Sequence, residues 1–135
     1  MIGEVTMLYA SDPFYKNKTI HSLGDVTIPA IALNRYKAWV KDKKLIGWCV
    51  WAFATEEEIE ADDWKGVEIL SRKDGDQIRI LHFMCKGGKK ETLMFVNHIR
   101  PSLSKQYPQV KFATASRRKL NGSVRPHKWF RKDTQ

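Results

Sequence analysis

Gln77–Ile99 runs QIRILHFMCKGGKKETLMFVNHI, and this stretch decides the fold. Its first half is an apolar run with one imidazole, His82, and is typical of a buried strand. The run breaks at the segment Lys86–Lys90, after which apolar residues recur with helical spacing. The sequence therefore predicts a buried strand, a cationic glycine turn and a helix.

The turn between that strand and that helix is a candidate anion site. Backbone N–H groups at a helix start point outward with the positive end of the helix dipole, and glycine lets a ligand approach the backbone. We expect a phosphate-bearing ligand to contact Lys86, Gly87, Gly88, Lys89 and Lys90. An ordinary strand–turn–helix connection with solvated lysines is the alternative.

The composition predicts one folded domain, residues 1–135, with a basic surface. Hydrophobic residues make up 42% of the 135, which is enough for a sizeable core. Lysine and arginine total 24 against 15 aspartates and glutamates, a net charge of +9. This excess favours an acidic partner, which could be a nucleic acid, an anionic membrane surface, an acidic protein or a phosphorylated cofactor.

No motif indicates a metal site, secretion or a membrane span. Cys49 and Cys85 lie far apart inside apolar runs, so we expect free thiols in a reducing compartment. Residues 1–10 lack the basic and apolar regions of a signal peptide. No apolar run approaches the ~20 residues that a membrane span needs. These features predict a cytoplasmic protein and leave its oligomeric state open.

A helix and a β-hairpin are predicted in the first third of the chain. Ile2–Ala10 has apolar residues at helical spacing. Tyr36–Lys41 and Leu45–Phe53 flank a polar turn and are rich in strand-forming residues. The second strand is apolar nearly throughout, with Trp48 and Trp51 on opposite faces, so we expect it to be covered on both sides.

Weaker patterns connect these elements to the central stretch. We interpret the polar segment around His21 as a loop, and Thr27–Trp39 as a segment that becomes strand-like by Tyr36. A capping box at Thr55–Glu58 predicts a helix start. Val67–Ser71 is interpreted as a strand that pairs with Gln77–Cys85 through a hairpin.

After the central helix the sequence predicts a basic hairpin, residues 110–132. Pro101 and Pro108 are expected to bracket the end of the helix. Val110–Ala115 and Val124–Arg131 read as strands joined by a turn at Asn121-Gly122. Basic and aromatic side chains on a hairpin can follow a phosphate backbone and stack on bases. The candidate contacts for nucleic acid or another acidic partner are Arg117, Arg118, Arg125, Lys128 and Arg131.

The order of elements predicts an α+β protein. An antiparallel meander is followed by a strand–turn–helix–strand unit, which gives a central, mostly antiparallel sheet flanked by helices. This layout matches the N-acetyltransferase (GNAT) type of fold.

The residues themselves resemble the RTX-toxin-activating lysine acyltransferases. Gly3–Pro13 (GEVTMLYASDP) is similar to that family's N-terminal motif GxVxWLWxxSPxHR. The alignment with the family continues without a gap, so that Asn17 and Pro29–Ile31 fall where the family has Asn and the triplet PAI. Gly47–Phe53 (GWCVWAF) and Asp63-Trp64 resemble its A-Y-C-S-W-A strand and its E-D-W. The similarity covers about residues 2–112.

The resemblance implies a GNAT-like acyltransferase, and two departures from the family pattern affect the site. Acyl-acyl-carrier protein would be the donor and a protein lysine the acceptor. The family's catalytic histidine and aspartate align with Tyr15 and His82. The chain is also shorter than the toxin activators, so a diverged, phage-like member that acts on another substrate is expected.

Catalysis can be assembled from the residues that are present. Amide formation needs a neutral amine, and the leaving thiolate needs a proton. Imidazole, with a pKa near ~6.5, suits a base, while a phenol, with a pKa near ~10, suits a proton donor. The hypothesis is that His82 is the base or substrate-orienting group and Tyr15 the acid, with Asp12 orienting either one. Packing alone is the alternative for both, and His21 is a fallback base.

Two functions follow. In the first, the protein moves an acyl group from acyl-carrier protein or acyl-CoA to an amine and holds no tightly bound cofactor. The chain lacks the usual acetyl-CoA loop pattern, which leaves a carrier-protein donor open. In the second, the protein is an inactive GNAT-like module that binds nucleic acid or protein through its basic hairpin.

Overall fold

The computed structural model describes residues 2–11, 20–55, 57–58, 66–73, 75, 77–118 and 124–130. The helices are α1 (Ile2–Ser11), α2 (Ile20–Ala32), α4 (Gly66–Ser71) and α5 (Gly88–Gln106). The strands are β1 (Tyr36–Lys41), β2 (Lys44–Phe53), β3 (Gln77–Cys85), β4 (Phe112–Arg118) and β5 (Val124–Phe130).

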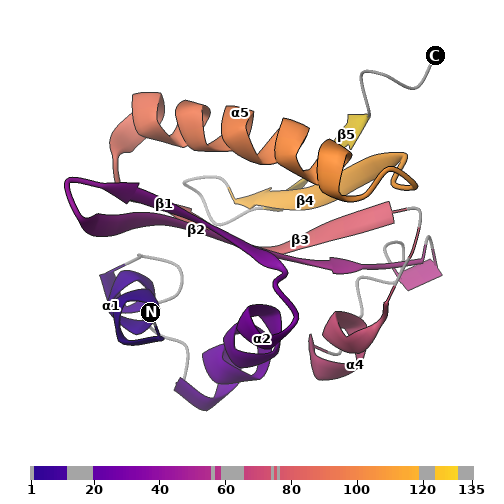
Figure 1. Cartoon of the computed structure of the whole chain (residues 1–135), viewed down its shortest axis with the longest axis horizontal. Helices are drawn as coiled ribbons and strands as arrows, with labels where there is room; N and C mark the ends of the chain where they lie inside the picture. The colour runs from indigo at the N-terminus through magenta and orange to yellow at the C-terminus, as the bar shows by residue number, and fades with distance from the viewer. Residues whose placement is uncertain are drawn as a thin grey trace.

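The strands form one sheet in the order β1-β2-β3-β4-β5. Neighbouring strands are antiparallel except β3 and β4, which are parallel and are connected through α5. Helices α1, α2 and α4 cover one face and α5 covers the other (Figure 1). The predicted α+β fold with a mostly antiparallel sheet is confirmed.

Strand β2 is the centre of two separate cores. Trp48 lies in the core under α1, α2 and α4, while Trp51 lies in the core under α5, and both side chains are fully buried. The predicted two-faced strand is therefore confirmed. Asp42 and Lys43, at φ 51° and 63°, form the two-residue turn that joins β1 to β2, as the right-handed strand twist requires.

Three further local predictions are confirmed. Helix α1 buries Val5, Leu8 and Tyr9 at the predicted spacing. The Glu58 amide donates to the Thr55 hydroxyl at 3.2 Å, and the Thr55 amide donates to the Glu58 carboxylate at 3.0 Å, which completes the capping box. Strand β5 pairs with β4 at the edge of the sheet.

Val67–Ser71 is helical, so the predicted strand and its hairpin to β3 are wrong. Helix α4, Gly66–Ser71, has six residues, which are too few for periodicity to separate a short helix from a strand. Tertiary contacts decide the outcome, because Ile69 and Leu70 are buried in the α1–α2 core. The guanidinium of Arg35 also donates to the carbonyl oxygens of Leu70 and Arg72, which caps the end of α4.

Two further boundaries differ from the prediction. The segment around His21, interpreted as a loop, belongs to α2, which continues through Pro29. The helix ends in a Schellman motif, because Asn34 has φ 56° and the Arg35 amide donates to the Ala30 carbonyl at 2.8 Å. Helix α5 likewise passes through Pro101 and ends at Gln106. Favourable packing of the other turns outweighs the hydrogen bond that an interior proline removes.

Candidate functional site

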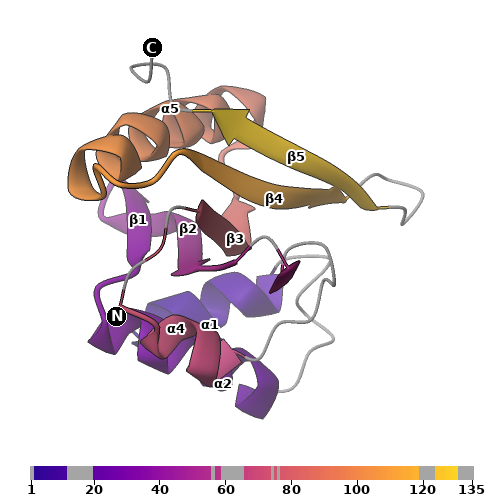
Figure 2. The ribbon, with the colours of Figure 1, turned by 90° about the vertical axis from the view of Figure 1, so that its right-hand side faces the viewer.

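Strands β3 and β4 separate soon after they meet. They pair only at Gln77–Arg79 against Phe112–Thr114, although β3 continues to Cys85 and β4 to Arg118. Figure 2 shows β4 and β5 turned away from the direction of the first three strands. Beyond Arg79, β3 does not continue its pairing with β4 in the described residues, so an extended ligand could add to its backbone there as a strand does.

A β-bulge lies on β3 at the edge of the split. Val50 pairs with His82 while Trp51 pairs with Ile80, which leaves Leu81 as the extra residue. Without the bulge, His82 would share the α5 face with Ile80, because side chains alternate along a strand. With it, the imidazole lies on the face that α1 covers.

The imidazole of His82 is held by a residue of α1. The phenol oxygen of Tyr9 lies 2.6 Å from Nδ1 of His82, and the two rings meet edge to face at 5.4 Å. The Thr27 hydroxyl of α2 donates to the phenol oxygen at 3.2 Å. Three elements, α1, α2 and β3, thus contribute to one hydrogen-bonded chain beside the split.

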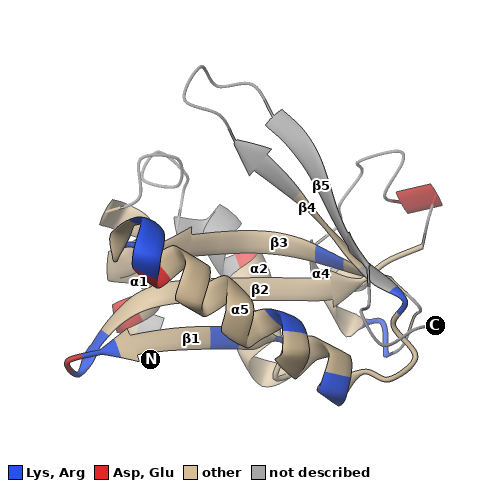
Figure 3. Ribbon diagram, turned by 90° about the horizontal axis from the view of Figure 1, so that it is seen from above, with Lys and Arg blue, Asp and Glu red and all other residues tan. Residues whose placement is uncertain are grey.

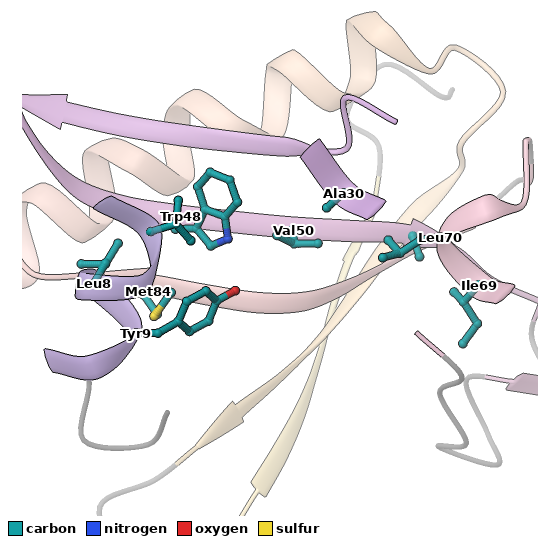
Figure 4. Close-up of a cluster of buried hydrophobic side chains, with 10 residues drawn as sticks. Leu8, Tyr9, Ala30, Trp48, Val50, Ile69, Leu70 and Met84 are labelled. Carbon is teal, nitrogen blue, oxygen red and sulfur yellow. The ribbon is translucent and has the colours of Figure 1, made fainter. Parts of the chain in front are cut away.

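The phenol of Tyr9 lies among apolar side chains. It is 2% exposed, and Figure 4 shows the indole nitrogen of Trp48 close to its hydroxyl. Burial raises the pKa of Tyr9 to about 12, although the Thr27 hydroxyl and the Trp48 indole N–H each act to lower it. The indole N–H is buried and makes no hydrogen bond of normal geometry, so it acts on the phenol only as a nearby dipole. Tyr9 therefore keeps its proton at neutral pH.

The predicted anion site is at the far end of β3. Lys86, Gly87, Gly88, Lys89 and Lys90 are all exposed, and α5 starts at Gly88 with no side-chain cap. Gly88 has φ 79°, a conformation that favours glycine. A Cβ at Gly87 would lie 2.3 Å from the Cβ of Glu91, so only glycine fits there.

A buried carboxylate adjoins the lysines of this turn. Glu91, in the first turn of α5, accepts from Lys41 at 2.6 Å and from the Trp39 indole at 2.9 Å. These two donors lower the pKa of Glu91. The contact joins α5 to the β1–β2 hairpin, which carries Lys43 in its turn and Lys44 at the start of β2. Figure 3 shows the basic residues of both segments at the same end of the molecule. We call this set the lysine end: Lys41, Lys43, Lys44, Lys86, Lys89 and Lys90.

The remaining predicted site residues are not placed. Asp12, Tyr15 and Arg131 lie outside the described residues, so their proposed roles are untested. For the basic hairpin the structure gives backbone register, in which Arg117 pairs with Arg125 and Thr114 with Lys128. The side chains of residues 116–118 and 124–130 lie outside the description.

Sequence reasoning missed Tyr9 and Glu91. Tyr9 occupies a buried position on the apolar side of α1, where the pattern predicts only that the tyrosine packs in the core. Its partner is 73 residues away in sequence, so no local pattern could join the two. Glu91 had a usable signal, because an acidic residue in the first turn of a helix favours the helix dipole.

Two kinds of feature are absent where the chain is described. Among the described residues no group of three or more His, Cys, Asp or Glu could hold a metal ion. No helix in the described ranges is long and apolar enough to cross a membrane.

Comparison with known proteins identifies the family. The sequence model of the RTX toxin acyltransferase family matches residues 1–125. An uncharacterised protein of Synechocystis is 29% identical over 110 residues, which cover 76% of this chain and 74% of that protein. The RTX-II toxin-activating lysine-acyltransferase ApxIIC of Actinobacillus pleuropneumoniae is 26% identical over 110 residues, 74% of this chain and 62% of the activator.

A solved structure shares the fold. It is the GNAT-like decarboxylase GphF in complex with isobutyryl-CoA, with a TM-score of 0.67 at 10% identity. The similarity covers 88% of this chain and 63% of GphF. At 10% identity this similarity establishes that the fold is GNAT-like, and it gives no information about activity. From the match to residues 1–125, the chain belongs to the RTX toxin acyltransferase family.

Proposed function

We propose that this protein transfers an acyl group from a thioester donor to an amine, beside His82 at the split between β3 and β4. The observation that carries the proposal is the bulge at Leu81, which turns His82 toward Tyr9 at the point where the sheet opens. In a chain of an acyltransferase family, an imidazole held at an open strand edge is a candidate catalytic group.

The donor side of the site runs from the split to the lysine end. A pantetheine arm carries two amides, which can pair with the backbone of β3 beyond Arg79 as an added strand does. Its phosphate would then meet the start of α5, where exposed lysines and backbone N–H groups favour an anion. Acyl-carrier protein and acyl-CoA both supply a phosphate on a pantetheine arm.

The acceptor is proposed to be a protein lysine or a similar amine. The Actinobacillus relative is a toxin-activating lysine-acyltransferase, and this chain covers 62% of its length.

His82 is the proposed catalytic group, and Tyr9 is its partner in the described part of the chain. Tyr15 as the acid and Asp12 as the orienting group stay predictions from the family alignment.

The experiment compares two histidine variants of the full chain. Acyl-carrier protein or CoA charged with a short acyl group is offered together with lysine-containing peptides. Thiol release and the mass of the peptide are followed over time. His82→Ala should lose activity by about 100-fold or more. His98→Ala is the matched control, because His98 is exposed on α5, on the opposite face of the sheet, where its ring contacts Trp39. Equal activity of His82→Ala and wild type would reject the site.

A further inference from the structure

Helix α5 has an inner and an outer side of different character. The side that faces the sheet holds the buried residues of the helix, which are Glu91, Phe95, Ile99 and Leu103. These residues recur every four positions, so the residues halfway between them lie on the outer side. Figure 3 looks onto this outer side. It is the surface of α5 that a partner could reach.

Two large apolar side chains are exposed near the start of this helix. Leu93 is 61% exposed and Met94 is 44% exposed. Single exposed apolar residues are common on protein surfaces, but these two lie next to each other on one helix. Lys89 and Lys90 each precede one of them by four positions, so the four side chains are neighbours on the helix surface. We call Lys89, Lys90, Leu93 and Met94 the α5 patch.

The α5 patch is cationic. Glu91 is the only acidic residue of α5, and its carboxylate accepts from Lys41 and from the Trp39 indole on the inner side of the helix. The first turn of a helix adds the positive end of the dipole. The patch therefore combines apolar contact area with positive potential, and this is complementary to apolar side chains that lie among carboxylates.

This combination favours an acidic protein over other occupants. A second copy of the same patch would bring like charges together, which is unfavourable. Aliphatic side chains offer no aromatic ring on which nucleic-acid bases could stack. A helix that binds at a membrane surface buries a whole apolar face, whereas the apolar face of α5 already packs on the sheet.

The position of the α5 patch indicates which protein docks there. Lys89 and Lys90 belong to the lysine end, where the proposed function places the phosphate of the donor. A protein bound on the first turns of α5 therefore meets the phosphate end of the pantetheine arm. The amine acceptor must instead reach the thioester, which the proposed function places beside His82.

We propose that the α5 patch docks the acidic protein that carries the pantetheine arm of the donor. Leu93 and Met94 are its apolar anchors, and Lys89 and Lys90 pair with its carboxylates. The identity of this partner as the donor rests on the proposed function. Apolar anchors within a polar rim are the usual anatomy of a protein interface. Free CoA offers the same phosphate but no protein surface to the patch.

Nitrogen NMR of the labelled full chain tests the docking without any chemistry. The probe is an acidic acyl-carrier protein in its apo form, which lacks the pantetheine arm. We expect the amide signals of the α5 patch to shift during the titration, with an affinity that falls as salt is added. Leu93→Gln with Met94→Gln should weaken this binding by about tenfold or more. Absence of binding at low salt, or equal binding by the double variant, would overturn the proposal.

Ile28→Gln with Leu33→Gln is the matched control. These side chains are 56% and 43% exposed, in α2 and directly after it, and α2 covers the other face of the sheet (Figure 1). Glutamine is a good helix former of similar length, so both double variants should fold. The control should bind the apo carrier protein as wild type does. An equal loss of binding in the two double variants would contradict docking at the α5 patch.

Transfer assays with two donors separate this proposal from the proposed function. The same acyl group is offered on a carrier protein and on CoA. Leu93→Gln with Met94→Gln should raise the KM for the carrier-protein donor by about tenfold or more and leave the KM for acyl-CoA nearly unchanged. An equal rise for both donors would show that the patch contacts the arm itself, and the docking proposal would be wrong.

Two further outcomes distinguish the two proposals. Transfer from acyl-CoA without patch-dependent binding of the carrier protein would reject the docking and leave the proposed function intact. Patch-dependent binding of the apo carrier protein, with no transfer from either donor to any acceptor, would support the docking and reject the proposed function.

Two other occupants of the patch predict different results. Vesicles of anionic phosphatidylglycerol test a membrane surface, and sedimentation of the protein alone tests a second copy. We expect neither vesicle binding nor self-association to depend on the α5 patch. Either one, if it were present in wild type and lost in Leu93→Gln with Met94→Gln, would overturn the proposal.

Discussion

At the scale of single residues, the space around a side chain decides what each position tolerates. Gly47 lies in strand β2, next to the core under α5. A Cβ built there would be 2.8 Å from the Cβ of Trp39 and 2.9 Å from the ring of Phe95. Those two rings contact each other at a tilted angle with a centroid distance of 5.9 Å, so neither can withdraw without disturbing the other. The glycine inside an apolar strand marks a close approach, as its place in the sequence indicated.

Gly47→Ala should therefore destabilise the protein by about 1–3 kcal/mol through overpacking. Gly3→Ala is the matched control, since a Cβ at Gly3 in α1 would meet nothing within 4 Å. Alanine is the better helix former, so this control should be neutral or slightly stabilising. Urea unfolding of both variants measures the difference, and equal midpoints would contradict the predicted clash.

At the scale of elements, the sequence correctly predicts the helices and strands whose pattern lies within their own residues. Helix α1, the β1–β2 hairpin and the β3–α5 unit each carry their own periodicity, turn residues or cap, and all three form. Val67–Ser71 has no such local pattern, because its helix is stabilised by Arg35 and by the core under α2, which are distant in sequence. The site is predicted only in part for the same reason. His82 could be singled out from its strand, whereas its contact with Tyr9 exists only after α1 docks on the sheet.

Glu91 links two elements, and the link should depend on pH. Its pKa is lowered by Lys41 and Trp39, so its contribution to stability is present above the unfolded pKa of ~4.3 and is lost as pH falls through the lower folded value. Wild type should thus lose more stability than Glu91→Gln between pH 7 and about pH 3. Urea unfolding at both pH values measures this difference. A larger loss in Glu91→Gln would show that the sign is wrong.

At the scale of the whole molecule, the position of charge matters more than its total. The net charge of +9 cannot indicate where an anionic donor binds. The fold collects lysines from the β1–β2 turn and the start of α5 at one end, next to the carboxyl end of β3 (Figure 3). Charge placed at that end acts on a bound phosphate within a Debye length of about 8–10 Å, and charge elsewhere is screened.

Charge reversal at the two ends of α5 tests this directly. Lys89→Glu with Lys90→Glu should raise the donor KM by about tenfold or more, because a phosphate then meets repulsion at the helix start. Lys105→Glu with Lys111→Glu removes the same charge near the other end of α5, roughly 25 Å away along the helix, and should change KM little. Raising the salt concentration should reduce the difference between the two pairs. Equal effects of both reversals would mean that the donor responds to overall charge, and the lysine end would lose its role as the donor site.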